Sequence, residues 1–276
     1  NEIIKEQNAL TREQFGVGYR TQLTAQLYAA DCRDASDRAT CKPTALPGVR
    51  AEAARALVKL DEIQRGAEGA PSARLVGAWL DDVRLVEADF RGTNFDEASF
   101  RGATLERSIF VGASFEGADF TSATLEESDF TNARLFKPTF ARALLQGSDF
   151  TRATFYPADR PVMRDRDDVP DFSTARALKD LTFKDANLIK ARFDARAVLR
   201  VDFSGAKLVQ SSFAGAKVTK STFAGADLTG ANFTGATLVD VDLTGATLDE
   251  AKMRDVTMRE VTCPDGKKSE AKGGKC

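Results

Sequence analysis

The sequence contains no histidine, only four cysteines and a single tryptophan. Histidine is the usual general base and the commonest metal ligand, so its absence excludes most hydrolytic triads and many metal centres. No apolar run approaches the roughly 20 residues that a helix needs to cross a bilayer. The formal net charge is only −2, which argues against a dedicated nucleic-acid-binding protein, since such proteins carry a strong basic excess.

The feature that dominates the chain is a five-residue repeat. Leu or Phe recurs at every fifth position from Leu75 to Phe155, and a similar series runs from Leu178 to Met258. Two positions before most of these central residues stands alanine. Neither the 3.6-residue period of a helix nor the two-residue period of a strand produces this spacing. A disordered low-complexity tract is the alternative, but regularly spaced Phe and Leu are too numerous for it.

A 20-residue period is superimposed on the five-residue period, because the same residue type returns at every fourth repeat. Four five-residue sides therefore return the chain to the same place, and we expect a solenoid of about eight coils stacked at about 4.8 Å. Each side can direct inward its large central residue and the small residue beside it. The expected core columns include Phe90, Phe110, Phe130 and Phe150, and later Leu188, Leu208 and Leu228.

The segments ADFRG, ADFTS, ANLIK, ADLTG and ANFTG resemble the pattern A(D/N)LXX of the pentapeptide-repeat family. The resemblance covers residues 73–262. It implies an all-β solenoid in the form of a right-handed quadrilateral β-helix. It does not imply one function, because the family includes inhibitors of DNA gyrase and many proteins with no known activity.

The segment that precedes the repeat, at 1–72, has a different pattern and predicts helices. An earlier helix is expected over much of residues 2–28, and a second one places five apolar residues on one face. An open end of a β-helix exposes core side chains and unpaired strand edges. We therefore expect residues 1–72 to form a small N-terminal α-helical cap. The apolar face of the second helix comprises Val49, Ala53, Leu57, Leu60 and Ile63.

Between Phe155 and Leu178 the five-residue spacing fails, because the interval is slightly longer than one coil and contains three prolines. Since proline cannot donate a ladder hydrogen bond, we expect a loop at 157–172 that bulges from one continuous β-helix at 73–262. Four of the aspartates in this loop cluster among its arginines. A calcium loop is one interpretation, but the glycine and closing glutamate of an EF-hand are absent; local salt bridges are the other. These aspartates are Asp165, Asp167, Asp168 and Asp171.

The four cysteines fall as two local pairs, Cys32 with Cys41 and Cys263 with Cys276. A zinc site would need thiolates from both ends of a long rod, so two disulfides or free thiols are the remaining interpretations. The tail at 263–276 also resembles a Cys-bounded ending of exported bacterial pentapeptide proteins. Disulfides imply an oxidising, extracytoplasmic compartment such as the periplasm. The sequence begins at Asn1 and not at Met, which is compatible with removal of a signal peptide or membrane anchor.

The residue after each central residue should point outward, and one row of these positions contains two aromatic residues next to the arginine-rich loop. Aromatic side chains and arginines are enriched at protein interfaces. The row is therefore a candidate protein-binding surface, although the loop could instead fold back and cover it. The candidate residues are Phe136, Tyr156, Arg160, Arg164, Arg166 and Leu199.

No catalytic constellation, metal site or cofactor motif is present in the sequence, so we expect a non-enzymatic protein. The preferred function is a rigid protein-binding or scaffolding module, a subunit or accessory factor of an extracytoplasmic or membrane-associated assembly. Its partners would be proteins and not nucleic acid, with membrane contact only through an upstream anchor or a partner. The alternative is a DNA mimic that inhibits or protects DNA gyrase. Residues 75–156 carry 13 acidic and 8 basic residues, whereas residues 178–262 carry 11 and 12, so only half the rod is mildly acidic.

Overall fold

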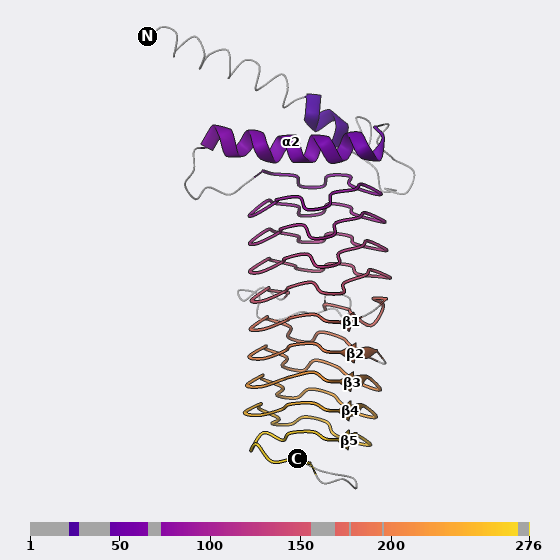
Figure 1. Cartoon of the computed structure of the whole chain (residues 1–276), viewed down its shortest axis with the longest axis vertical. Helices are drawn as coiled ribbons and strands as arrows, with labels where there is room; N and C mark the ends of the chain where they lie inside the picture. Colours follow the sequence, from indigo (N-terminus) through magenta and orange to yellow (C-terminus); the bar gives the residue numbers. More distant parts are fainter. Residues whose placement is uncertain are drawn as a thin grey trace.

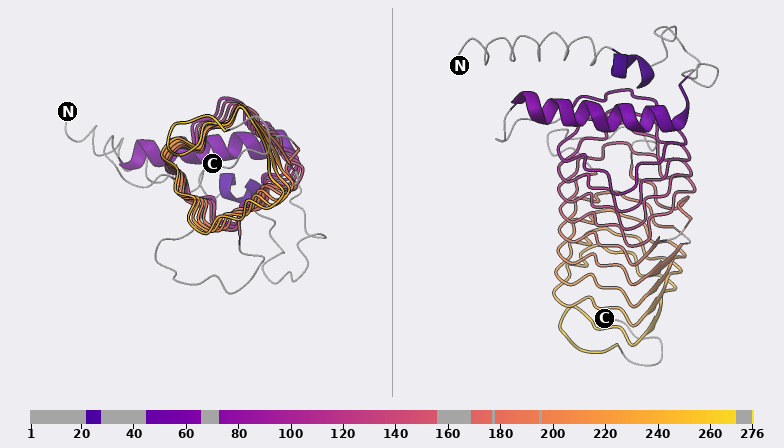
Figure 2. Two further views of the ribbon diagram at one scale, coloured as in Figure 1. Left: turned by 90° about the horizontal axis from the view of Figure 1, so that it is seen from below. Right: turned by 45° about the horizontal axis from the view of Figure 1, so that its top comes forward.

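The computed structural model describes residues 22–27, 45–65, 73–155, 169–176, 178–194, 196–269 and 276. Helix α2 (Pro47–Arg65) lies across one end of a stack of coils, which form a right-handed quadrilateral β-helix (Figure 1). The view along the rod in Figure 2 shows the four-sided outline and the superposition of the coils. Five short strands pair in parallel in the order β1-β2-β3-β4-β5. They are β1 (Leu178–Lys179), β2 (Ala197–Leu199), β3 (Lys217–Thr219), β4 (Thr237–Val239) and β5 (Thr257–Arg259).

We number the four faces in chain order by their first central residues, with face 1 at Leu75, face 2 at Leu80, face 3 at Leu85 and face 4 at Phe90. Parallel bridges join equivalent residues of successive coils. Along face 1 the bridged residues are Arg74, Asn94, Ser114, Arg134, Thr154, Asn187, Lys207, Asp227 and Thr247. The described part of face 1 therefore contains nine coils, close to the predicted number of about eight.

Backbone hydrogen bonds along the rod axis hold each coil to the next. The central residue donates to the following coil, as in Leu75 N to Asn94 O at 2.7 Å, and the residue before it donates to the preceding coil, as in Asn94 N to Ala73 O at 2.9 Å. At the corner, the second residue after the centre adopts a left-handed conformation, with φ of 66° at Gly102 and 51° at Lys220. Glycine adopts this conformation without steric cost, which explains its frequency at this position.

The interior consists of columns of central side chains. Phe110 stacks between Phe90 and Phe130, with ring centroids at 5.7 and 5.0 Å, and it meets Phe115 of the adjoining face edge-on at 5.4 Å. Stacked and edge-on pairs are the favoured geometries of aromatic rings. All seven predicted core residues are completely buried, namely Phe90, Phe110, Phe130, Phe150, Leu188, Leu208 and Leu228.

The Asp or Asn of the repeat has a local structural role. Its side-chain oxygen accepts a hydrogen bond from the backbone N–H two residues later, as in Thr121 N to Asp119 Oδ1 at 2.8 Å and Thr151 N to Asp149 Oδ1 at 2.7 Å. This Asx turn satisfies an N–H group at the start of the corner. The carboxylates at this position thus stabilise the backbone turn at the corner.

The β-helix continues through the interruption. Phe140 stacks on Phe172 at 5.4 Å and Phe150 stacks on Phe183 at 5.1 Å. Asp171 bridges Thr139, so the inserted loop ends before Asp171, and the predicted loop of 157–172 extends too far. The reason is that Pro170 already stands where most repeats have alanine, and its carbonyl already accepts the ladder hydrogen bond from Arg192 N at 2.8 Å.

Helix α2 closes the N-terminal end of the rod (Figure 2), with Ala53, Ala54 and Leu57 in the same buried cluster as the coils. The prediction that Val49 lies on the buried face is wrong, since it is 45% exposed, while Arg50 is only 6% exposed. The guanidinium of Arg50 donates to Ala45 O at 2.7 Å and to Asp81 O at 2.5 Å. Burial lowers the pKa of Arg50, and the nearby carboxylates oppose this effect. The exposures of Leu60 and Ile63 lie outside the described residues.

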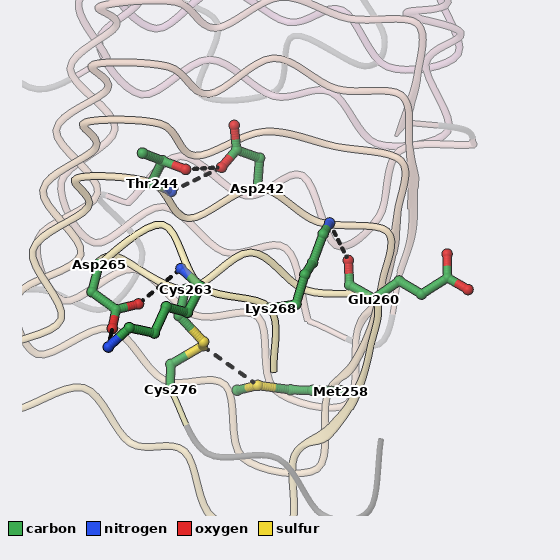
Figure 3. The surroundings of a disulfide bond; sticks show 9 residues. Asp242, Thr244, Met258, Glu260, Cys263, Asp265, Lys268 and Cys276 are labelled. Carbon is green, nitrogen blue, oxygen red and sulfur yellow. Dashed lines mark hydrogen bonds and ion pairs between the residues drawn. A yellow bond between two sulfur atoms is a disulfide. The ribbon is translucent and has the colours of Figure 1, made fainter. Parts of the chain in front are cut away.

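A disulfide between Cys263 and Cys276 closes the C-terminal end, as Figure 3 shows. Cys263 occupies the last central position of face 4 and is buried. The tail pairs antiparallel with this coil through Thr262 and Lys268, and Ser269 N donates to Val261 O at 2.8 Å. Cys32 and Cys41 lie outside the described residues.

Replacement of Phe110 by Ala should destabilise the fold by about 3 to 5 kcal/mol, because it opens a cavity between two stacked rings. Chemical denaturation of the variant and of an exposed control, Glu116→Ala, measures the difference. Equal midpoints for Phe110→Ala and the wild-type protein would contradict the stacked core.

Loss of the Cys263–Cys276 disulfide should lower the free energy of unfolding by about 2 to 3 kcal/mol, because the bridge restricts the unfolded chain. Unfolding of the Cys276→Ala variant and of the reduced, alkylated protein measures this effect. Peptide mapping without reductant identifies the pairs, including the predicted Cys32–Cys41 pair. Recovery of four free thiols from natively isolated protein would contradict both pairings and the oxidising compartment.

Candidate protein-binding surface

Of the predicted binding residues, the structure describes Phe136 and Leu199. Phe136 is half-buried on face 1, and Lys137 Nζ lies 5.4 Å from the centroid of its ring. Tyr156, Arg160, Arg164 and Arg166 lie outside the described residues.

The acidic cluster of the loop is also only partly described, because Asp165, Asp167 and Asp168 lie outside the described residues. The carboxylate of Asp171 accepts a hydrogen bond from Ser173 N at 2.8 Å and forms an ion pair with Arg192 at 3.4 Å. Within the described ranges, no group of three or more acidic or cysteine side chains converges as a metal site would require. These contacts correspond to the salt-bridge interpretation of Asp171.

Leu199 does not belong to the row of Phe136. It pairs with Lys179 and Thr219 in the β1–β3 part of the sheet, on face 3. The bridges of face 1 continue directly from Thr154 to Asn187, across the inserted loop. The prediction that Leu199 shares the row of Tyr156 assumed that the first side after the loop returned to face 1. Instead, Phe172 first occupies face 2, and Leu178 then occupies face 3.

With the correct register, the outward row of Phe136 continues to Ile189 and Val209. Both residues directly follow central residues of face 1 and both are half-buried. The row is thus a longitudinal apolar stripe, where the equivalent positions elsewhere on this face are mostly polar. One signal in the sequence could have revealed it: alignment of Phe155 with Leu188, and not with Leu178, restores the Leu and Phe columns on both sides of the insertion.

Four cations flank this stripe. Arg134 and Lys207 stand directly before a central residue, and Lys137 and Lys190 stand two positions after one. The four cations therefore lie on both sides of the apolar row. Within the described residues, Arg134, Lys190 and Lys207 form no ion pair, and Arg134 and Lys207 are exposed. We call the whole surface the face 1 patch, and it comprises Arg134, Phe136, Lys137, Ile189, Lys190, Lys207 and Val209.

The same face is acidic on either side of the patch. Toward the N-terminus its outward positions include Asp96, Glu97 and Glu116, and toward the C-terminus they include Asp227 and Asp249. Asp96 is engaged in the fold, since its carboxylate accepts hydrogen bonds from Ser114 Oγ at 2.6 Å and Glu116 N at 2.8 Å. The cations of this face therefore gather in its middle coils, apart from Arg74 in the first coil.

An open groove lies at the corner between faces 3 and 4, and its lining mixes cations with carboxylates. One of its cations, Arg200, is paired with Asp180, with nitrogen–oxygen distances of 2.5 and 2.9 Å. The hydrogen-bonded guanidinium lowers the pKa of the Asp180 carboxyl below its ordinary value. In the lining as a whole, three aspartates balance three cations, whereas cations predominate in the face 1 patch.

Coils of four five-residue sides, Asx turns and stacked Phe and Leu columns define a four-sided β-solenoid that presents a rigid lateral surface. Models of the family described as pentapeptide repeats match residues 72–107 and 98–135, and a model of the pentapeptide repeat region matches residues 176–253. Together the matches cover more than half of the chain. The protein belongs to the pentapeptide-repeat family.

Solved structures of this family are similar to the chain. HetL, a protein involved in heterocyst differentiation regulation from the cyanobacterium Nostoc sp. strain PCC 7120, is 27% identical, with 71% of this chain and 87% of that chain covered and a TM-score of 0.33. QnrB1, a plasmid-mediated fluoroquinolone resistance protein, is 22% identical, with 67% and 89% covered and a TM-score of 0.47. No curated protein matches the chain. All these similarities concern the repeat and do not identify a partner.

The register across the insertion can be tested with paired pyrene labels. Labels on a Thr154→Cys/Asn187→Cys variant should give strong excimer fluorescence, because neighbouring coils lie about 4.8 Å apart. Labels on Thr154→Cys/Ala197→Cys, which join faces 1 and 3, should give little. Strong excimer emission from the second pair alone would contradict the assignment of Asn187 to face 1.

Proposed function

We propose that this protein is a non-enzymatic binding or scaffolding module, a subunit or accessory factor of an extracytoplasmic or membrane-associated assembly. The observation that carries the proposal is the face 1 patch. Phe136 and Arg134 are of residue types that are enriched at protein interfaces, and the apolar row supplies area that a partner can bury. The rod supports this role because its stacked coils hold the row in a fixed geometry, which lowers the entropy lost on binding.

The chemistry of the surface supports a role without catalysis. Many of the carboxylates accept backbone N–H groups in Asx turns or bind the serine of the next coil, as Asp81 binds Ser99 Oγ at 2.5 Å. Such carboxylates stabilise the solenoid. The sequence also lacks histidine, so general acid–base chemistry would depend on other groups.

The Cys263–Cys276 disulfide supports placement in an oxidising compartment, because disulfides persist there and are rare in reducing cytosol. In the part of the chain that the structure describes, no helix is long and apolar enough to cross a membrane. Association with a membrane would then use a partner or a further segment.

The charge pattern favours the scaffold over the gyrase alternative. A duplex mimic needs a continuous acidic face, but cations occupy the middle of face 1. On face 4 the bridged row of aspartates is interrupted by Ile109, Thr182 and Thr222. Neither face thus offers the unbroken acidic surface of a duplex mimic.

Replacement of Phe136, Ile189 and Val209 together by Ser should abolish partner capture while leaving the melting temperature within a few degrees of wild type. A matched control, Leu199→Ser/Val239→Ser, changes equivalent half-buried positions on face 3 and should retain capture. Crosslinking in the native cell followed by quantitative mass spectrometry compares the partners. Equal capture by the face 1 variant would refute the proposed surface, and loss of stability with unchanged capture would leave the row a structural role only.

A further inference from the structure

Face 3 carries opposite net charges in its two halves. Its central residues run from Leu85 in the first coil to Met258 in the ninth, with Leu178 in the fifth, and β1 to β5 lie on this face (Figure 1). Its outward positions are those directly before, directly after and two after each centre. The first four coils have four glutamates and two arginines there, a net charge of −2, and the last four have four cations and two carboxylates, a net charge of +2. On faces 1 and 4, by contrast, neither half has a basic excess.

The charges of face 3 are not used by the coil itself. On the other faces the position before the centre often holds an Asp or Asn that makes an Asx turn, whereas the described coils of face 3 have neither residue there. Glu127 and Lys220 are exposed, and within the described residues neither forms an ion pair or a side-chain hydrogen bond. The insertion leaves face 1 after Phe155 and rejoins face 2 before Asp171, so neither of its ends lies on face 3.

Two copies of this face complement each other when their rods run antiparallel. A two-fold axis that lies in the interface, perpendicular to the rods, reverses the order of the coils and places each column of outward residues opposite itself. With this axis at the fifth coil, the third coil faces the seventh and the fourth faces the sixth. Glu127 then lies opposite Lys220, and Leu144 lies opposite Ala197. Parallel rods would instead place like charges together, so the charge pattern selects the antiparallel arrangement.

Like charges meet at two places in this register, and each is already compensated within its own chain. In the fifth coil, Lys179 and Asp180 face their own copies, but they form an ion pair with each other at 3.6 Å. At the ends of the face, Glu87 faces Glu260, but Glu87 forms an ion pair with Arg107 at 2.9 Å. The charges that face each other in the third and seventh coils are opposite in sign, so they favour this register.

The size of the face is compatible with a reversible dimer. Nine coils span about 38 Å, and a side of five residues is about 14 Å wide. Full overlap would therefore bury roughly 500 Å² of each copy, or about 1,000 Å² in total, which is the lower end of the range for specific interfaces. We propose that the partner of face 3 is a second copy of this chain, paired antiparallel about a two-fold axis at the coil of Leu178.

This dimer does not rest on the face 1 patch, because face 1 lies on the opposite side of the rod from face 3. Pairing through face 3 would leave one face 1 patch on each outer side of the dimer. A scaffold with two such patches could bind two partner sites at once, which raises the overall affinity without any new contact.

Sedimentation velocity at increasing protein concentration tests the dimer. The wild-type protein should pass from monomer to dimer, with a dissociation constant that rises with salt. Glu127→Lys and Lys220→Glu should each weaken self-association by about tenfold or more, because two-fold symmetry places like charges together twice. Both positions have a positive φ, 57° and 51°, so exchange of Lys and Glu makes similar demands on the backbone. An equimolar mixture of the two variants should restore the dimer, since each contact between different variants again joins opposite charges.

The controls Glu116→Lys and Lys207→Glu make the same changes in the third and seventh coils of face 1 and should leave the dimer unchanged. Thermal melts establish that each variant remains folded. A wild-type protein that stays monomeric at high concentration and low salt would overturn the proposal. Equal weakening by the face 1 controls would indicate non-specific association and would also overturn it. If the mixture fails to restore the dimer, the antiparallel register is wrong.

Discussion

The backbone ladder between coils is the interaction on which the whole structure depends. Each central N–H group donates to the next coil, and each preceding N–H group donates to the previous one, as Leu75 and Asn94 illustrate. The ladder requires neighbouring coils to follow the same path. Equivalent residues of successive coils must therefore adopt the same conformation, and each short side leaves room for only one large and one small inward residue. Stacked Phe columns and buried alanines follow from this constraint.

The same constraint separates surface positions whose residue type the coil restricts from positions where many residue types are accepted. The residue before the centre often serves an Asx turn, and the second residue after it must tolerate a left-handed φ, as Lys220 does. The residue directly after the centre is less restricted, since its backbone conformation suits many side chains. The apolar row of Phe136, Ile189 and Val209 occupies this less restricted position. A partner surface can thus change without disturbing the ladder or the core.

The open edges at the two ends of the rod are covered in different ways. At the N-terminal end, α2 covers the first coil, and the guanidinium of Arg50 satisfies carbonyls of Ala45 and Asp81. At the C-terminal end, the tail adds an antiparallel bridge on face 4 and the disulfide fixes it to Cys263. The packing of α2 stabilises the fold by removing apolar area from water, whereas the disulfide stabilises it mainly by restricting the unfolded chain.

The sequence by itself determined the coil, its family and the inward residues, because the periods of five and twenty follow directly from the geometry of the ladder. It also indicated the capping helix, but not that Arg50 and not Val49 would lie on the inner side. One of the carbonyls that Arg50 binds belongs to Asp81 in the first coil, 31 residues along the chain. The candidate surface was half predicted. The sequence placed Phe136 in the outward row, and its binding role remains a prediction, but Leu199 was assigned to the wrong face and Ile189 and Val209 were not included. The five-residue pattern is the same on all four faces, so it cannot show which face the chain reaches after an insertion. Only the tertiary pairing of Thr154 with Asn187 decided that.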